Sequence, residues 1–241
     1  MSTRPGVLAS VARRVLPPTP IGSGLAQAPL SRFAAAAIGI AVLASDLARR
    51  DAAYGARIVV SLLGLGLLVL LARDRWITIG VRGRPLPSWR WWIRGTLVSA
   101  AIVALALGAF WCWLLVTGTR VQPALQVNSI ADLPAAAWRL CVVAPIVEES
   151  VYRVVLVTAL VPSIGAWGAI VVSGIAFAGL HHLYGNPGPD NQVAGFLLAW
   201  AYLRSGAIWI PVVLHSLGNA CALVDHVGLA EGWWHLPGAP S

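Results

Sequence analysis

Residues 141–153, CVVAPIVEESVYR, decide the fold, because they place two adjacent carboxylates and a guanidinium inside an otherwise apolar run. In a helix surrounded by lipid, each charged group near the middle costs about 2.5–3.5 kcal/mol. Such groups persist when they face the interior of a helical bundle and find partners there. The stretch therefore predicts a bundle of helices with a polar interior.

The composition extends this prediction to the whole chain. The chain has 241 residues, 58% hydrophobic and 11% charged, with a mean hydropathy of +0.77. A soluble domain of this size needs more charge on its surface. Because one span needs roughly 20 apolar residues, the chain can hold about six to eight. We predict an all-α, polytopic transmembrane bundle of about seven spans, near residues 32–48, 55–72, 95–116, 135–161, 164–183, 191–204 and 207–225.

The basic residues are all arginines and give a net charge of +8. They flank the apolar runs and form no separate basic domain, so we expect contact with membrane lipid and no nucleic-acid partner. With seven spans, eleven arginines fall on the side of the amino terminus and five on the other side. This asymmetry predicts that the amino terminus is inside and the carboxyl terminus outside.

The chain reads as one domain with two tails. Residues 1–30 contain arginines and prolines but no long apolar core that ends in a cleavage site. We predict that they form a flexible cytoplasmic tail and not a signal peptide. Residues 31–225 form the transmembrane helical domain, and residues 226–241 form a short C-terminal tail.

Within the quoted stretch, the three charged residues fall into a pair and a third group. Glu149 and Arg153 stand at i and i+4, so they share a helix face and can form an ion pair. That pair could serve the site or simply hold helices together. Glu148 is rotated by about 100° from Glu149 and points elsewhere. A carboxylate in a low-dielectric environment suits base chemistry, so Glu148 is the better candidate for function.

Two further apolar runs carry polar side chains. His181 lies at the end of one run, and Phe177 precedes it by one helical turn, where its ring could support the imidazole or simply pack. His215 and Asn219 stand at i and i+4 on the last run. A hydrogen bond between helices would stabilise such a pair by only about 0.6 kcal/mol, so we favour a functional role.

These residues permit two hydrolytic mechanisms. Glu148 could deprotonate a water molecule, with His181, His215 and Asn219 stabilising the oxyanion. Alternatively, His181, His215 and Glu148 could hold zinc or another divalent metal, which would activate the water. The sequence has no H-E-x-x-H motif, so a metal site would have to be assembled across helices.

The same residues resemble the signature of the CPBP family, which groups type II CAAX prenyl endopeptidases with bacteriocin-processing and abortive-infection (Abi) proteins. The E-E-x-x-x-R motif is matched by Glu148, Glu149 and Arg153. F-x-x-x-H is matched by Phe177 and His181, and H-x-x-x-N by His215 and Asn219. The resemblance covers a CPBP-like core at residues 130–225.

The resemblance implies that Glu148, His181, His215 and Asn219 are catalytic and that Glu149, Arg153 and Phe177 support them. We therefore expect an intramembrane endopeptidase, glutamate-dependent or metalloprotease-like, that hydrolyses a peptide bond of a membrane-associated or membrane-proximal substrate. We expect it in a bacterial plasma membrane as a multi-pass protein. A proton- or ion-coupled transporter and a non-catalytic membrane partner in immunity or signalling are the alternatives.

Overall fold

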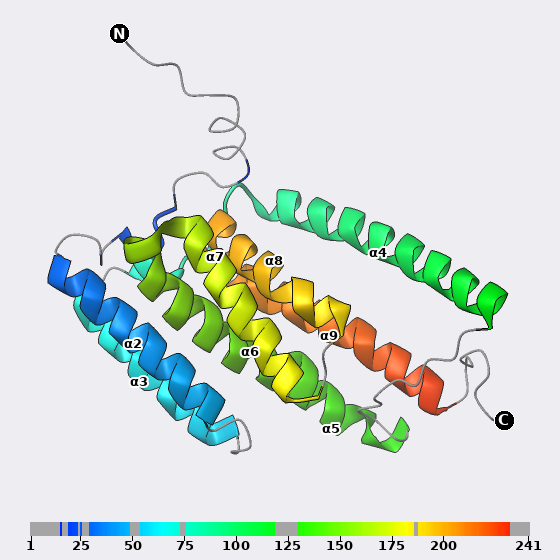
Figure 1. Ribbon diagram of the computed structural model, residues 1–241. Coiled ribbons are helices and arrows are strands. Elements are labelled where there is room, and N and C mark those ends of the chain that lie inside the picture. Colours follow the sequence, from blue (N-terminus) through cyan, green and yellow to red (C-terminus); the bar gives the residue numbers. More distant parts are fainter. Residues whose placement is uncertain are drawn as a thin grey trace, which may run out of the picture. The chain divides into compact units, whose positions relative to one another are not determined.

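The computed structural model describes residues 15, 19–23, 25, 29–48, 54–72, 76–118, 130–185 and 188–231. Over these ranges the secondary structure is helical, without a strand, which confirms the all-α fold class (Figure 1). Helices also occupy all seven predicted apolar runs. Two helical segments are long and apolar enough to cross a membrane, Ile130–Leu183 and Trp209–Gly228, and Gly55–Leu71 is a shorter apolar helix. The number of membrane crossings stays a prediction.

The chain forms two compact units, each described here by itself. Unit 1 consists of Met1–Pro87 and Ile146–Val212, and unit 2 consists of Ser88–Pro145 and Val213–Ser241. Two continuous helical segments pass from one unit to the other, one at residues 145–146 and one at residues 212–213.

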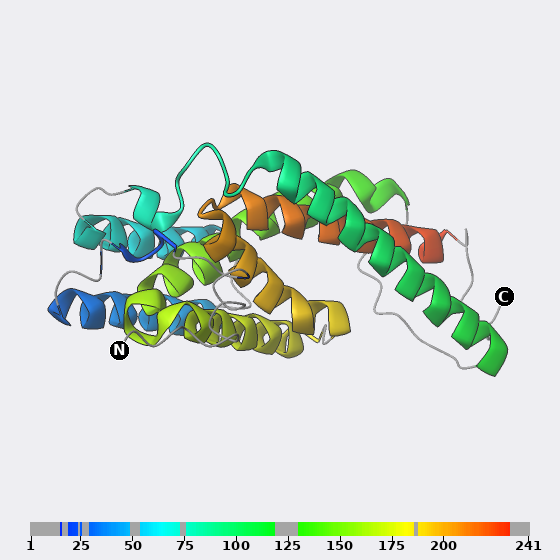
Figure 2. The same cartoon turned by 90° about the horizontal axis from the view of Figure 1, so that it is seen from above.

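The helices of unit 1 enclose the larger core. They are α2 (Pro29–Ala48), α3 (Tyr54–Ala72), the short η2 (Trp76–Ile79), most of α6 (Ala144–Glu149), η5 (Ser150–Val157), α7 (Thr158–Leu183) and α8 (Pro189–Ser205). α2 packs against α3, η5 and α7, and both views show α2 and α3 side by side (Figures 1 and 2). Tyr152, Phe177 and Tyr202 are among the buried side chains of this core.

A break at Gly165 divides the long helical segment into two legs. Gly165 has φ 74° and ψ 172°, a left-handed backbone that other residues rarely adopt, and Pro162 precedes it. The break lies within one residue of the predicted boundary between the fourth and fifth spans. Because η5 packs against α7, the two legs form a hairpin without a loop of its own.

The outer surface of unit 1 is apolar. On α3, the side chains of Leu62, Leu63 and Leu70 are 60%, 64% and 72% exposed. A contiguous apolar surface of this kind would be a liability in water, whereas lipid tails cover it without cost. The exposed leucines therefore agree with a helix that faces lipid.

A short N-terminal segment contributes to the same core. Ile21 and Leu25 are fully buried, and the amide of Gly22 donates a hydrogen bond of 3.0 Å to the carbonyl of Thr78. Both side chains lie within residues 1–30, which the sequence predicts to be a flexible tail. Ile21 and Leu25 are thus packed into the helical core, and the flexible tail stays a prediction for the rest of the stretch.

Unit 2 contains α4 (Trp89–Thr117), η3 (Ile130–Asp132), α5 (Leu133–Trp138), η4 (Arg139–Val143), the start of α6 and most of α9 (Trp209–Ala230). Its small core joins α5 to α9 through Ala136, Leu223 and Val227. Glu231, just after α9, accepts a hydrogen bond of 2.6 Å from the amide of Ile130. These contacts align the start of α5 with the end of α9.

The contact between α7 and α8 depends on two glycines. A Cβ atom at Gly195 would lie 2.9 Å from the carbonyl oxygen of Gly174 and 2.9 Å from Cβ of Phe177. Small residues let membrane helices approach closely in this way. The close approach matters because α7 carries Phe177 and His181.

We expect Gly195→Ala to destabilise the protein, by about 1–3 kcal/mol, because the added methyl group overpacks this contact. Gly179→Ala is the matched control, since a Cβ there meets nothing within 4 Å. Alanine also favours a helix over glycine, so the control should be neutral or stabilising. Thermal unfolding in detergent measures both, and equal melting temperatures for the two variants would contradict the prediction.

Candidate active site

The helix that carries the E-E-x-x-x-R motif is not a regular α-helix. It changes from α6 to a π-helix, η5, directly after Glu149. The amide that follows η5, that of Thr158, accordingly reaches back five residues to the carbonyl of Arg153. π-helical segments are rare and frequently mark functional sites.

The three charged side chains of this motif are buried. Glu148 is 6% exposed, while Glu149 and Arg153 are 0% exposed. Nε of Arg153 lies 2.8 Å from Oε2 of Glu149, so the predicted ion pair is present. The wider turn of the π-helix keeps positions i and i+4 on one face, which is why the pairing survives the change of helix type.

The guanidinium of Arg153 also contacts the second leg of the hairpin. Its Nη1 donates a hydrogen bond of 3.2 Å to Oγ of Ser173, which in turn donates one of 3.1 Å to the carbonyl of Tyr152. Its carbon atom Cζ lies 4.8 Å from the centroid of the Phe177 ring, a cation–π distance. Arg153 therefore ties the motif helix to α7 through both polar and aromatic contacts.

Phe177 and His181 form the next part of the site. Their ring centroids are 4.4 Å apart, and Nδ1 of His181 lies 3.0 Å from the carbonyl oxygen of Phe177. A carbonyl can only accept a hydrogen bond, so Nδ1 carries the proton. This arrangement orients the ring and, in the neutral imidazole, makes Nε2 the nitrogen that binds a proton, a water molecule or a metal.

The hairpin brings Glu148 and His181 to the same level. Tyr152 on the first leg packs edge-on against Phe177 on the second, with centroids 5.5 Å apart. The legs are antiparallel, so one turn further from the break are residue 148 on the first leg and residue 181 on the second. Glu148 and His181 therefore lie one turn beyond the same aromatic contact.

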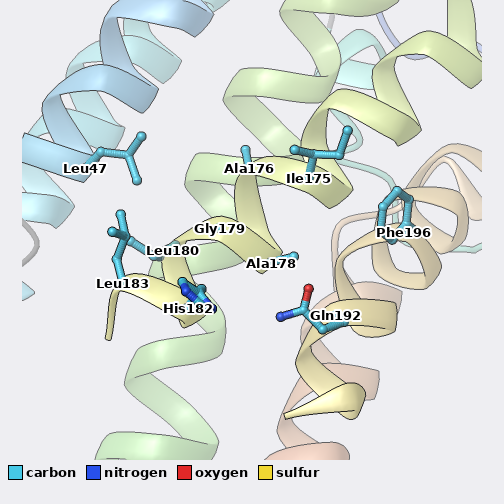
Figure 3. A pocket seen from close by; sticks show the side chains of 10 residues that line it. All are labelled: Leu47, Ile175, Ala176, Ala178, Gly179, Leu180, His182, Leu183, Gln192 and Phe196. Atoms are coloured by element: carbon cyan, nitrogen blue, oxygen red, sulfur yellow. The ribbon is translucent and has the colours of Figure 1, made fainter. Parts of the chain in front are cut away.

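An apolar pocket of about 620 Å³ opens beside the end of α7 (Figure 3). Leu47 of α2, Ile175 and Leu183 of α7, and Phe196 of α8 are among its lining residues. His182 contributes the polar edge on α7, and Gln192 stands opposite on α8 (Figure 3). The pocket lies within unit 1 and adjoins the turn of α7 that carries His181.

His215 and Asn219 lie on the part of α9 that belongs to unit 2. His215 is buried and Asn219 is half-buried. The amide Nδ2 of Asn219 donates a hydrogen bond of 2.7 Å to the carbonyl of Leu140. For Asn219 the structure thus shows a hydrogen bond to another helical segment, which the sequence offered as the alternative to a functional role, and the functional role stays a prediction.

Pro145 explains why this carbonyl needs a donor. In η4 the amide of Ala144 donates to the carbonyl of Arg139, five residues back. The next bond in that pattern would join residue 145 to Leu140, but proline has no amide hydrogen. Asn219 supplies the missing donor from α9. Its side-chain amide has a second hydrogen that this bond leaves available.

The structure therefore groups the predicted site residues by unit. Unit 1 holds Glu148, Glu149, Arg153, Phe177 and His181, with Glu149 paired to Arg153 and Phe177 in contact with His181. Unit 2 holds His215 and Asn219 and connects Asn219 to the first turns of the motif helix. That the two groups form one site stays a prediction.

Three polar partners of the site were not predicted from the sequence. Ser173 was not singled out in the sequence, yet its hydroxyl joins Arg153 to the carbonyl of Tyr152. Tyr152 itself donates a hydrogen bond of 3.3 Å to Asp46 on α2. A single hydroxyl in an apolar helix carries no periodic signal that names its partner, although a lone aspartate in an apolar run does mark Asp46.

Of three comparisons with known proteins, one found a match. Residues 129–221 match the family model described as type II CAAX prenyl endopeptidase, Rce1-like. All seven residues of the three motifs lie inside the matched segment, so the resemblance to the CPBP family is confirmed there. No curated protein and no solved structure matches the chain. The matched family implies a membrane-embedded protease of the CAAX type.

The suggested metal site was also compared with the structure. Over the described ranges, no group of three or more His, Cys, Asp and Glu side chains is placed to hold a metal ion. Catalytic zinc usually takes three protein ligands. Unit 1 supplies Nε2 of His181 and the carboxylate of Glu148, and the third ligand, His215, belongs to unit 2. Zinc binding therefore stays a prediction.

Removing one charge of the Glu149–Arg153 pair should destabilise the protein more than removing both charges. Glu149→Gln leaves a buried guanidinium without its counter-charge, and Arg153→Met leaves a buried carboxylate, so each should destabilise the protein by about 3 kcal/mol. The double variant should recover part of that loss, because it leaves no unpaired charge buried. Unfolding midpoints of the four proteins test this, and additive losses would refute it.

The missing amide hydrogen of Pro145 leads to a second double-mutant comparison. Asn219→Ala should destabilise the protein by about 1 kcal/mol, because the carbonyl of Leu140 loses its donor. In a Pro145→Ala background the backbone regains an amide hydrogen, so the same change should cost close to nothing. Thermal unfolding measures both steps. If Asn219→Ala destabilised the Pro145→Ala protein as much as the wild type, the lost hydrogen bond to the carbonyl of Leu140 would not be the cause.

Proposed function

We propose that the protein is an intramembrane endopeptidase that hydrolyses a peptide bond in a membrane-associated substrate. The observation that carries this proposal is the hairpin, which sets Glu148 and His181 one turn beyond the same Tyr152–Phe177 contact. The match to CAAX-type proteases supports the reaction class. Glu148 acts as the general base that removes a proton from the attacking water.

The other site residues stabilise the charge that develops on the substrate. With its Nδ1 proton directed to Phe177, His181 acts through Nε2, which holds the water or receives and returns a proton. The second amide hydrogen of Asn219, together with His215, serves as the donor for the oxyanion. Glu149 and Arg153 contribute by fixing the motif helix.

Two features support a membrane substrate. The pocket beside His182 is apolar along most of its lining and suits a hydrocarbon segment of the substrate. The buried site residues lie on helices whose outer surfaces are themselves apolar. The donors at Glu148, His181 and His215 also suit zinc, which would supply Lewis-acid activation of the water if it binds there.

Peptidase activity can be tested with the purified protein in lipid vesicles and a library of membrane peptides. Glu148→Gln should lower the cleavage rate at least about 100-fold, because the general base is lost. Asp225→Asn is the matched control, since Asp225 is an exposed carboxylate on α9 outside the motifs. Equal cleavage by Glu148→Gln and the wild type would contradict the proposal, as would no cleavage by any of the three proteins. Metal analysis of the same samples decides whether zinc belongs to the site.

A further inference from the structure

The strongest unassigned feature of unit 1 is a buried ion pair between α2 and α3. Nε of Arg57 lies 2.7 Å from Oδ1 of Asp46, and its Nη2 lies 3.0 Å from Oδ2. The side chain of Asp46 is 1% exposed and that of Arg57 is 4% exposed. The arginines were expected to flank the apolar runs, but the structure buries Arg57 beside Asp46. It therefore contributes no charge to a loop.

Helix packing alone does not account for this pair. Burying two charges costs several kcal/mol per ion, so an ion pair of this kind is weak evidence for stability. α2 and α3 already pack through apolar side chains, for example where Val42 covers Gly64. A buried pair at such a place is better explained by a third group that it holds.

That third group is Tyr152 of the motif helix. Its hydroxyl donates to Oδ2 of Asp46, while its ring packs against Phe177 and its carbonyl accepts from Ser173. Tyr152 directly precedes Arg153 and lies one turn after Glu148. The hydroxyl contact is therefore the connection between the Asp46–Arg57 pair and the segment that carries the proposed base.

The type of helix makes such a connection necessary. Tyr152 lies in the eight-residue π-helix η5, and π-helices are rare and mostly limited to single turns, so a contact that holds this segment has a clear purpose. A shift of that register would rotate Glu148 relative to His181. Bidentate pairing with Arg57 fixes both oxygens of Asp46, so the hydroxyl of Tyr152 meets an acceptor at a defined position.

We propose that Asp46, held by Arg57, is a positioning residue that fixes Tyr152 and through it the rotation of the segment carrying Glu148. This inference rests on the proposed function for its kinetic consequence. Asp46 and Arg57 lie outside the segment that matches the protease family. The positioning device thus comes from the part of the chain to which no family signature applies.

Tyr152→Phe tests the proposal with the smallest change, the loss of one hydroxyl. We expect kcat for peptide cleavage to fall about 10- to 100-fold with KM little changed, because the base is displaced while the substrate pocket is not. Asp46→Asn should have a similar effect, and the double variant should be no worse than either single change. Tyr202→Phe is the matched control, since its buried hydroxyl contacts Thr158 of the same helical segment at 2.9 Å. The control should keep the wild-type kcat.

A second measurement is independent of catalysis. In a variant whose three natural cysteines are replaced by serine, Val151→Cys introduces a thiol at a fully buried position of η5. Its rate of reaction with a small maleimide should rise several-fold in the Tyr152→Phe and Asp46→Asn backgrounds and stay constant with Tyr202→Phe.

The two measurements separate the inference from the function on which it rests. Faster labelling in a protein that cleaves no peptide would uphold the positioning role and refute the peptidase. Cleavage with unchanged labelling and unchanged kcat in Tyr152→Phe would overturn the positioning role. A fall in kcat that Tyr202→Phe shows equally would also overturn it, because the effect would then be general loss of stability.

Discussion

The ion pair between Glu149 and Arg153 is the contact on which the surrounding structure of unit 1 depends. Both side chains are fully buried, so neither charge can be left without a partner. Arg153 reaches Ser173 and Phe177 across the hairpin, and these residues lie along the helix that ends at His181. Satisfying one buried guanidinium thus determines how the two legs of the hairpin meet.

A second buried pair, Asp46–Arg57, reaches the same helix through the neighbouring residue, Tyr152. Consecutive helical residues point roughly 100° apart, so Tyr152 and Arg153 contact different surroundings. Two contacts therefore hold the motif helix from different sides. The hydroxyl of Tyr152 contacts Asp46, and the guanidinium of Arg153 contacts Ser173. Two such contacts define a rotation that either contact alone would leave open.

Much of this arrangement follows from sequence patterns. Apolar runs predicted the helices, and the spacing of Glu149 and Arg153 predicted their pairing, because both are properties of one segment. The π-helix was not predictable, since no periodic pattern distinguishes it from an α-helix over eight residues. The pairing of Arg57 with Asp46, and that of Asn219 with the carbonyl of Leu140, could not be specified for another reason. In each pairing the two partners lie on different helices, and a sequence read segment by segment does not specify which helices become neighbours.

The break at Gly165 also sets how deep the chemistry lies. Residue 148 precedes the break by 17 positions and residue 181 follows it by 16, a helical length of at most about 25 Å on either leg. The hydrocarbon core of a bilayer is about 30 Å thick. If the break lay at one membrane surface, the carboxylate and the imidazole would lie only a few ångströms below the other. A hydrolytic site at that depth would need only a short path for water, and no long hydrated channel through the bundle.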